Sequence, residues 1–118
     1  MNALVNSNTG QVILDELDVR STFFGRLTGY ALRGFINCPG MLFLDTPRVH
    51  TLGMLFPLDL YFFDTSLRLL GSSQAIRPMK FPRSPRGTRH ILEIPHHAHN
   101  LSVELEAGEQ VSILWSAG

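Results

Sequence analysis

Short apolar runs, each ended after a few residues by a turn residue, dominate this sequence. Pro, Gly, Ser or an Asp-Thr pair separates the runs, which lie at 41–44, 49–54, 58–64, 67–76, 90–94, 101–105 and 110–115. Runs of this length between turn residues are typical of β-strands. Six or more such strands at close spacing predict a small β-sandwich or β-barrel. A doubly wound α/β sheet is not expected, because it needs helices that alternate with the strands.

Two further patterns lie in the first third of the chain. Residues 3–14 indicate two short strands around a turn at 6–10, where Asn and Gly tolerate positive φ. Apolar residues at spacings near three and four, with arginines between them, then predict one short amphipathic helix near residues 19–33. Gly25 and Gly29 lower the helix propensity of that stretch. We therefore expect a mainly β fold of about seven to nine short strands with one helix.

The size of the chain and its single cysteine limit how it is stabilised. Its 118 residues fit one domain, residues 1–118, and 44% of them are apolar, enough for a core that buries roughly 65% of the unfolded surface. Cys38 is the only cysteine, so no intramolecular disulfide forms and the reducing cytoplasm is the expected location. The first residues lack the features of a secretory signal. The most apolar stretch, 52–63, is interrupted by Pro57 and Asp59, and it is shorter than the roughly 20 residues of a membrane-spanning helix.

Positive and negative charges balance in number but are separated along the chain. Ten Lys and Arg residues offset ten Asp and Glu residues. Residues 65–92 contain six basic residues and no acidic one, whereas residues 93–118 contain four acidic residues and no Lys or Arg. Within the first stretch, every third position of what we call the basic segment, residues 77–89, is basic: Arg77, Lys80, Arg83, Arg86 and Arg89.

The basic segment has two interpretations. Pro78, Pro82 and Pro85 disfavour a helix and favour polyproline II, whose three-residue turn would align the five cations on one edge at about 9 Å intervals. Such an edge would bind an anionic chain or an acidic protein surface, whereas a β-strand would divide the cations between two faces. In the other interpretation, the segment is a solvated loop whose arginines pair partly with the acidic C-terminal residues.

A series of motifs connects the chain with a known family. In order, the motifs are Gly40-Met-Leu-Phe43, His50-Thr-Leu-Gly-Met54, Phe56-Pro-Leu-Asp59 with the strand that ends at Asp64, His90-Ile-Leu-Glu-Ile-Pro95 and Gly108-Glu-Gln-Val111. Together they resemble the family called domain of unknown function 192, over about residues 18–114, and Arg26-Leu-Thr-Gly29 is similar to its arginine and Gly-Leu segment. The resemblance implies a small, β-rich, single-domain sandwich or barrel with no established activity. The chain departs from the family after Pro95, where His96-His97-Ala98-His99 replaces the usual Ala-Gly.

Two acidic residues fall inside predicted strands. Asp59 lies in the apolar stretch 56–63, where a strand that starts at Leu58 would place it on one face with Tyr61 and Phe63. Glu93 is flanked by Leu and Ile in the same way. A buried carboxylate must be paired, hydrogen-bonded or protonated. Both residues are therefore candidate functional positions.

The two carboxylates have a catalytic and a structural interpretation. If their strands are neighbours, Asp59 and Glu93 could converge with His50 or Arg48 at one end of the barrel, and two carboxylates in unlike environments can serve as general acid and base. In the structural interpretation, Asp59 accepts hydrogen bonds from backbone N–H groups and fixes the turn at Pro57, while Glu93 pairs with an arginine.

The histidines next to Pro95 suggest a metal site, but they do not complete one. In an extended chain, His97 and His99 share a face and His96 points the other way. The motif alone therefore supplies at most two of the three or four ligands that zinc needs, and His50 and Asp59 would have to complete the set. We expect no metal and no cofactor, and His97 and His99 are only weak candidate ligands.

Other catalytic signatures are not present. Cys38 lies in a Pro-Gly turn, where nothing indicates the base that a nucleophilic thiol requires. The sequence contains neither a glycine-rich phosphate loop nor a Gly-x-Ser-x-Gly motif.

These observations favour a non-enzymatic binding or accessory module. Its basic segment, with Arg48 as a further candidate, would contact an anionic ligand or an acidic protein surface, and sequence-specific nucleic-acid binding is not expected. The alternative is a small hydrolase or lyase that uses Asp59 and Glu93 with His50. A third hypothesis is a structural accessory in an assembly. The sequence identifies neither the partner nor the oligomeric state.

Overall fold

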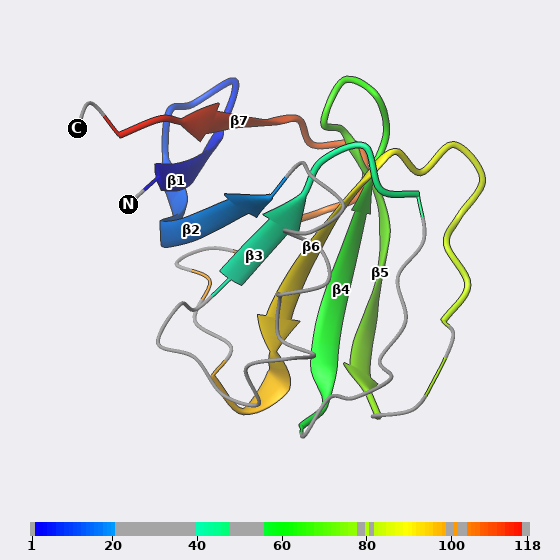
Figure 1. Cartoon of the computed structure of the whole chain (residues 1–118). Helices are drawn as coiled ribbons and strands as arrows, with labels where there is room; N and C mark the ends of the chain where they lie inside the picture. Colours follow the sequence, from blue (N-terminus) through cyan, green and yellow to red (C-terminus); the bar gives the residue numbers. More distant parts are fainter. Residues whose placement is uncertain are drawn as a thin grey trace.

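Seven strands and one short 3₁₀ helix make up the regular structure of the computed structural model (Figure 1). The structure describes residues 2–20, 40–47, 56–77, 80, 82–98, 101 and 104–116. The elements are β1 (Asn2–Asn6), β2 (Val12–Arg20), β3 (Gly40–Phe43), β4 (Leu58–Phe63), β5 (Leu69–Ile76), β6 (His90–Pro95), η1 (His96–Ala98) and β7 (Val111–Leu114).

All seven strands belong to one sheet, in the order β5-β4-β6-β3-β2-β1-β7. Neighbouring strands are antiparallel except for β2 and β3, which run parallel. The first hairpin forms at the predicted turn, where the Asn6 side chain accepts hydrogen bonds from the backbone of Asn8 and Thr9. Gly10 has a φ of 75°, a conformation that glycine adopts without strain. The hairpin predicted from residues 3–14 is therefore confirmed.

The two edge strands of the sheet are joined at one end. Arg68 and Gln110, which precede β5 and β7, form an antiparallel bridge. Backbone hydrogen bonds extend this link: Leu69 N donates to Glu109 O at 2.9 Å, and Val111 N donates to Leu67 O at 2.9 Å. The sheet therefore curls until its outer strands meet: in Figure 1 the orange chain that leads into β7 passes beside the green turn between β4 and β5.

Strand β4 is buried on both faces and separates two apolar clusters. All six of its residues are buried, which explains why its sequence is almost continuously apolar. The first core cluster contains Leu4, Ile13, Leu14, Leu17, Leu42, Tyr61, Phe63, Leu69, Leu92, Ile94 and Val111. The second core cluster contains Met41, Phe43, Leu58, Leu60, Phe62 and Ile91. Because side chains alternate along a strand, Tyr61 and Phe63 belong to one cluster and their neighbours to the other.

The predicted mainly β fold is confirmed. Strands β3 to β7 each coincide with a predicted apolar run. The predicted strand at 49–54 lies outside the described residues, and at 101–105 the described residues, 101, 104 and 105, form no strand. Of the predicted helix near 19–33, Val19 and Arg20 belong to β2, and the rest lies outside the described residues. In the part of the chain that is described, no helix is long and apolar enough to cross a membrane.

Candidate functional site

Asp59 is fully buried in β4, and its carboxylate accepts hydrogen bonds from two other elements. The backbone N–H of Ala75 in β5 donates to Oδ1 at 2.8 Å. Nδ1 of His96, the first residue of η1, lies 2.8 Å from the same oxygen. The Gln74 amide, oriented with its nitrogen toward Asp59, donates to both carboxylate oxygens at 3.2 Å. These contacts compensate for the loss of water around a buried charge.

A β-bulge in β5 directs these donors toward Asp59. Leu58 pairs with Ile76 and Leu60 pairs with Ser73, so that Gln74 and Ala75 together face the single residue Asp59. Ala75 has a φ of 53°, a left-handed conformation that is unfavourable for a residue with a Cβ atom. The bulge turns the Ala75 N–H toward the carboxylate. Strained backbone positions such as Ala75 cluster at functional sites in proteins.

His96 connects this buried carboxylate with solvent. Its side chain is 50% exposed, whereas that of Asp59 is 0% exposed. The backbone N–H of His96 donates to the Pro57 carbonyl at 3.0 Å, and this bond holds η1 against the start of β4. The neighbouring ring of His97 contacts Phe56 edge to face, with the ring centroids 5.1 Å apart.

Tyr61 extends the polar group on the same face of β4. Burial raises the pKa of the Tyr61 hydroxyl above its ordinary value, and the negative charges of Asp59 and Glu104 raise it further. The Gln74 side chain also forms a hydrogen bond with the Tyr61 side chain. Gln74 therefore contacts both Asp59 and Tyr61.

Glu93 lies on the opposite face of the sheet from Asp59. In the β4–β6 register, Glu93 pairs with Leu60, and Asp59 pairs with Ile94. Because adjacent positions of a strand point to opposite faces, Glu93 is on the side of the second core cluster. The predicted convergence of Asp59 and Glu93 is therefore wrong, although their strands are neighbours as that hypothesis required.

Glu93 is also not paired with an arginine. No hydrogen bond or ion pair joins its side chain to another described residue, and burial raises the pKa of its carboxyl from 4.5 to about 8. This shift favours the neutral form of Glu93 at pH 7.

Three predicted site residues lie outside the described residues: Arg48, His50 and His99. Among the described residues, no group of three or more His, Cys, Asp or Glu side chains is arranged to hold a metal ion. His97 contacts the ring of Phe56. The histidine that contacts Asp59 is His96.

The basic segment does not form one straight edge of five cations. Thr88 N donates to Pro85 O at 3.2 Å, and Gly87 has a φ of 93°, as in a tight turn with glycine at its third position. This turn spans residues 85–88 and includes Arg86, so the predicted polyproline II edge cannot continue to Arg89. Of the five cations, Arg77 and Lys80 are exposed and have interaction partners.

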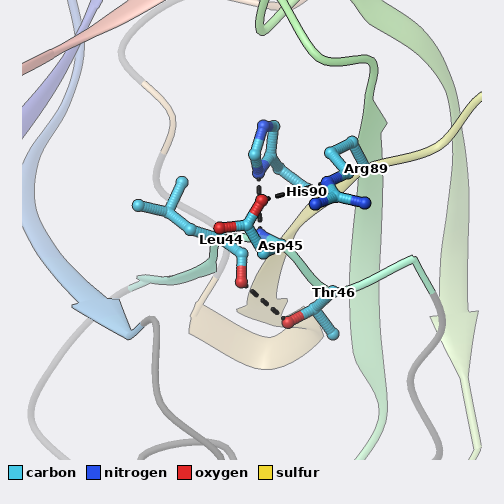
Figure 2. A network of polar contacts seen from close by, with 5 residues as sticks. All are labelled: Leu44, Asp45, Thr46, Arg89 and His90. Carbon is cyan, nitrogen blue, oxygen red and sulfur yellow. Dashed lines mark hydrogen bonds and ion pairs between the residues drawn. The ribbon is translucent and has the colours of Figure 1, made fainter.

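Arg89 is held in a separate polar network (Figure 2). Its Nε donates to Asp45 Oδ1 at 3.0 Å, and the backbone N–H of Asp45 donates to His90 Nδ1 at 3.0 Å. Burial lowers the pKa of His90 below its ordinary value of 6.5. Thr46 Oγ1 donates to the Leu44 carbonyl at 3.0 Å, which completes the network drawn in Figure 2. The network joins the end of β3 to the start of β6.

Arg83 and Arg86 differ from the other cations of the basic segment. Both are exposed, and within the described ranges neither forms a hydrogen bond or an ion pair. Of the acidic C-terminal residues, Glu109 has other partners: it accepts from Asn6 Nδ2 at 3.0 Å and from the Glu106 N–H at 2.7 Å. For Arg83 and Arg86, the predicted pairing with the acidic segment is not seen among the described residues.

The sequence interpretation missed His96 as the partner of Asp59. It treated His96 as the histidine that points away from His97 and His99 in an extended chain, whereas η1 curls the chain at this point. The available signal was the position of His96 directly after β6, the strand paired with β4. Because Leu58 pairs with Pro95, the residue after Pro95 lies beside the start of β4.

Comparisons with known proteins agree with the fold. The family model DUF192, described as Uncharacterized ACR, matches residues 4–113. A comparison with curated proteins gives no significant match. A crystal structure of a protein of unknown function from Novosphingobium aromaticivorans DSM 12444 is similar with a TM-score of 0.66 and 18% identity, over 94% of this chain and 82% of that one. A crystal structure of a candidate transcription regulator from Sinorhizobium meliloti 1021 is similar with a TM-score of 0.70 and 17% identity, over 94% of this chain and 90% of that one. At these identities the likeness concerns the fold alone.

Proposed function

Because the chain belongs to the DUF192 family, whose description names no activity, its function is argued from its own surface, and we propose an accessory binding module. In this proposal the chain is a single domain, residues 1–118, that lies in the cytoplasm and binds an anionic ligand through its basic segment. The segment contains no acidic residue, and none occurs anywhere between residues 65 and 92.

The observation that carries the proposal is that the side chains of Arg83 and Arg86 are exposed and have no carboxylate partner among the described residues. Arg89 is different, because Asp45 already accepts a hydrogen bond from it. Two unpaired arginines three positions apart can each form a charge-assisted hydrogen bond with a phosphate, sulfate or carboxylate group.

The segment around these arginines is held by the fold, which supports a preformed surface. A Cβ atom placed on Gly71 would lie 3.7 Å from Pro85 Cγ, and one placed on Gly87 would lie 3.8 Å from Leu70 Cδ1. The segment therefore packs against β5. Arg89 N also donates to the Phe63 carbonyl at 2.7 Å. Binding to a segment that is already ordered has a smaller entropic cost than binding to a free one.

Chromatography on immobilised heparin tests the proposal with three single variants. Arg83→Ala and Arg86→Ala remove a proposed contact, and Arg68→Ala is the matched control. Arg68 is exposed and carries the same charge, but it lies before β5 and donates to the Gly108 carbonyl. We expect the wild-type protein to bind at about 0.05 M salt and to elute as salt rises, and the first two variants to elute earlier than the control.

Two results would contradict anion binding by this segment. One is an unretained wild-type protein at about 0.05 M salt. The other is equal elution of all three variants, since a general effect of net charge would not depend on position. The predicted hydrolase or lyase based on Asp59 with Glu93 is not retained, because the sheet separates the two side chains.

A further inference from the structure

The contact between Asp59 and His96 determines where the imidazole carries its hydrogen. The Asp59 carboxylate accepts hydrogen bonds from the Ala75 N–H and from the Gln74 amide, oriented with its nitrogen toward Asp59. Several donors around a buried carboxylate favour its ionised form, and an ionised carboxylate can only accept. The hydrogen in the 2.8 Å contact therefore lies on His96 Nδ1. In the neutral ring, Nε2 then has no hydrogen, and its lone pair is free to take a proton.

The surroundings of His96 make this nitrogen usable by a ligand. Half of the side chain is exposed, although its partner Asp59 is completely buried. The backbone of His96 is fixed by its hydrogen bond to the Pro57 carbonyl. The ring is therefore anchored at Nδ1 and at its backbone, and half of the side chain remains exposed. The strained φ of Ala75 belongs to the same arrangement, because it points the Ala75 N–H at Asp59.

We infer that His96 Nε2 is the proton acceptor of a hydrolytic site for small acyl esters, with Asp59 as its positioning residue. This activity goes beyond the proposed anion binding and does not depend on it. A buried carboxylate that orients the Nδ1–H of a histidine, so that Nε2 can accept and return a proton, is the acid–base arrangement that serves acyl transfer.

The reaction needs no partner other than water. Nε2 takes a proton from a water molecule as the water oxygen bonds to the ester carbonyl carbon, which gives a tetrahedral anion and an imidazolium ring. The bond between that carbon and the alcohol oxygen then breaks, and His96 returns the proton to the departing oxygen. The products are a carboxylic acid and an alcohol, and the ring is neutral again. Asp59 stays ionised beside the ring throughout.

Hydrolysis of p-nitrophenyl acetate by the full chain tests the role of His96. His96→Gln removes the proton acceptor, and His97→Gln is the matched control, because His97 is the adjacent, exposed histidine with no carboxylate partner among the described residues. We expect His96→Gln to lower the rate constant at least about tenfold and His97→Gln to leave it unchanged. Added imidazole should restore part of the activity of His96→Gln. Equal rates for wild type and His96→Gln would overturn the inference.

Nitrogen NMR of the His96 ring tests the role of Asp59 separately. In the wild-type protein we expect a hydrogen on Nδ1 and none on Nε2 when the ring is neutral. Asp59→Asn should shift the hydrogen toward Nε2 and lower the hydrolysis rate, with a changed pH profile. A hydrogen on Nε2 in the neutral wild-type ring would overturn the inference. Because this measurement uses the wild-type protein, it decides the question even if Asp59→Asn does not fold.

Discussion

Asp59 Oδ1 and His96 Nδ1 lie 2.8 Å apart, although 37 positions separate them in the chain. The pairing of β4 with β6 brings them together, because it places Pro95 opposite Leu58 and therefore His96 beside Pro57, two positions before Asp59. One residue of this pair is sealed in the sheet and the other reaches solvent. Glu93, two residues before Pro95, faces the other way, and its environment leads to the first prediction.

The stability of the protein should fall as pH rises, because of Glu93. Burial raises the pKa of its carboxyl to about 8, against 4.5 ordinarily. Between these values the unfolded chain loses the proton and the folded chain keeps it, so the free energy of unfolding decreases with rising pH, by roughly 5 kcal/mol in total. Glu93→Gln should remove this decrease. Urea unfolding at pH 5 and pH 8.5 measures it.

The control for this experiment is Glu16→Gln, at an exposed position of β2. It should keep the pH dependence of the wild type. The prediction fails if Glu93→Gln and Glu16→Gln lose stability equally between the two pH values.

His90 should make the protein less stable in acid. Its pKa is lowered by burial, and its Nδ1 accepts the Asp45 N–H. As pH falls below 6.5, the unfolded chain binds a proton that the folded chain resists, so stability that is complete above pH 6.5 is lost as the pH approaches the lower folded pKa. His90→Gln should reduce this loss, measured by unfolding between pH 7.5 and pH 5. His97→Gln, at an exposed ring, should not change it, and a change of equal size would refute the assignment.

Ala75→Gly should stabilise the protein. Glycine adopts the φ of 53° found at Ala75 without the Cβ strain, and this gain outweighs its larger unfolded-state entropy, so we expect about 0.5–1 kcal/mol of added stability. Ala3→Gly is the control, because Ala3 lies in β1 and has no positive φ; there the same change should be destabilising by a similar amount. Thermal unfolding of both variants gives the comparison, and loss of stability in both would show that Ala75 is not strained.

Arg89→Ala should affect neither stability nor heparin binding strongly. Its ion pair with Asp45 is exposed, with side-chain exposures of 52% and 61%, and pairs of this kind contribute about 0–1 kcal/mol. Asp45 already neutralises the charge of Arg89. Arg89→Ala should therefore lower the salt concentration needed for elution less than Arg83→Ala does. An effect on elution as large as that of Arg83→Ala would mean that Arg89 belongs to the anion-binding surface.

The sequence predicts the strands well, because each apolar run between turn residues is a local signal. It also places Asp59 on one face with Tyr61 and Phe63, since alternation along a strand is local as well. The register between β4 and β6 is not local. Shifting the pairing of two strands by one residue exchanges their faces, and this is why neighbouring strands did not bring Glu93 to Asp59. The bulge at Gln74 and Ala75 has no signal in the sequence, because the positive φ occurs at an alanine rather than at a glycine.

The position of β7 at the outer side of β1 has a consequence for the order of folding. Ser7 and Ser112, whose hydroxyl groups are hydrogen-bonded, are separated by 105 positions, and among the described strands β1, which is synthesised first, is paired with β7, which is synthesised last. Until residues 111–114 are synthesised, β1 has an open edge that could pair with another chain. Closure of the sheet therefore waits for the synthesis of β7, and contacts so distant in sequence form slowly. A nascent chain of this protein should accordingly depend on protection of its N-terminal hairpin more than on that of its central strands.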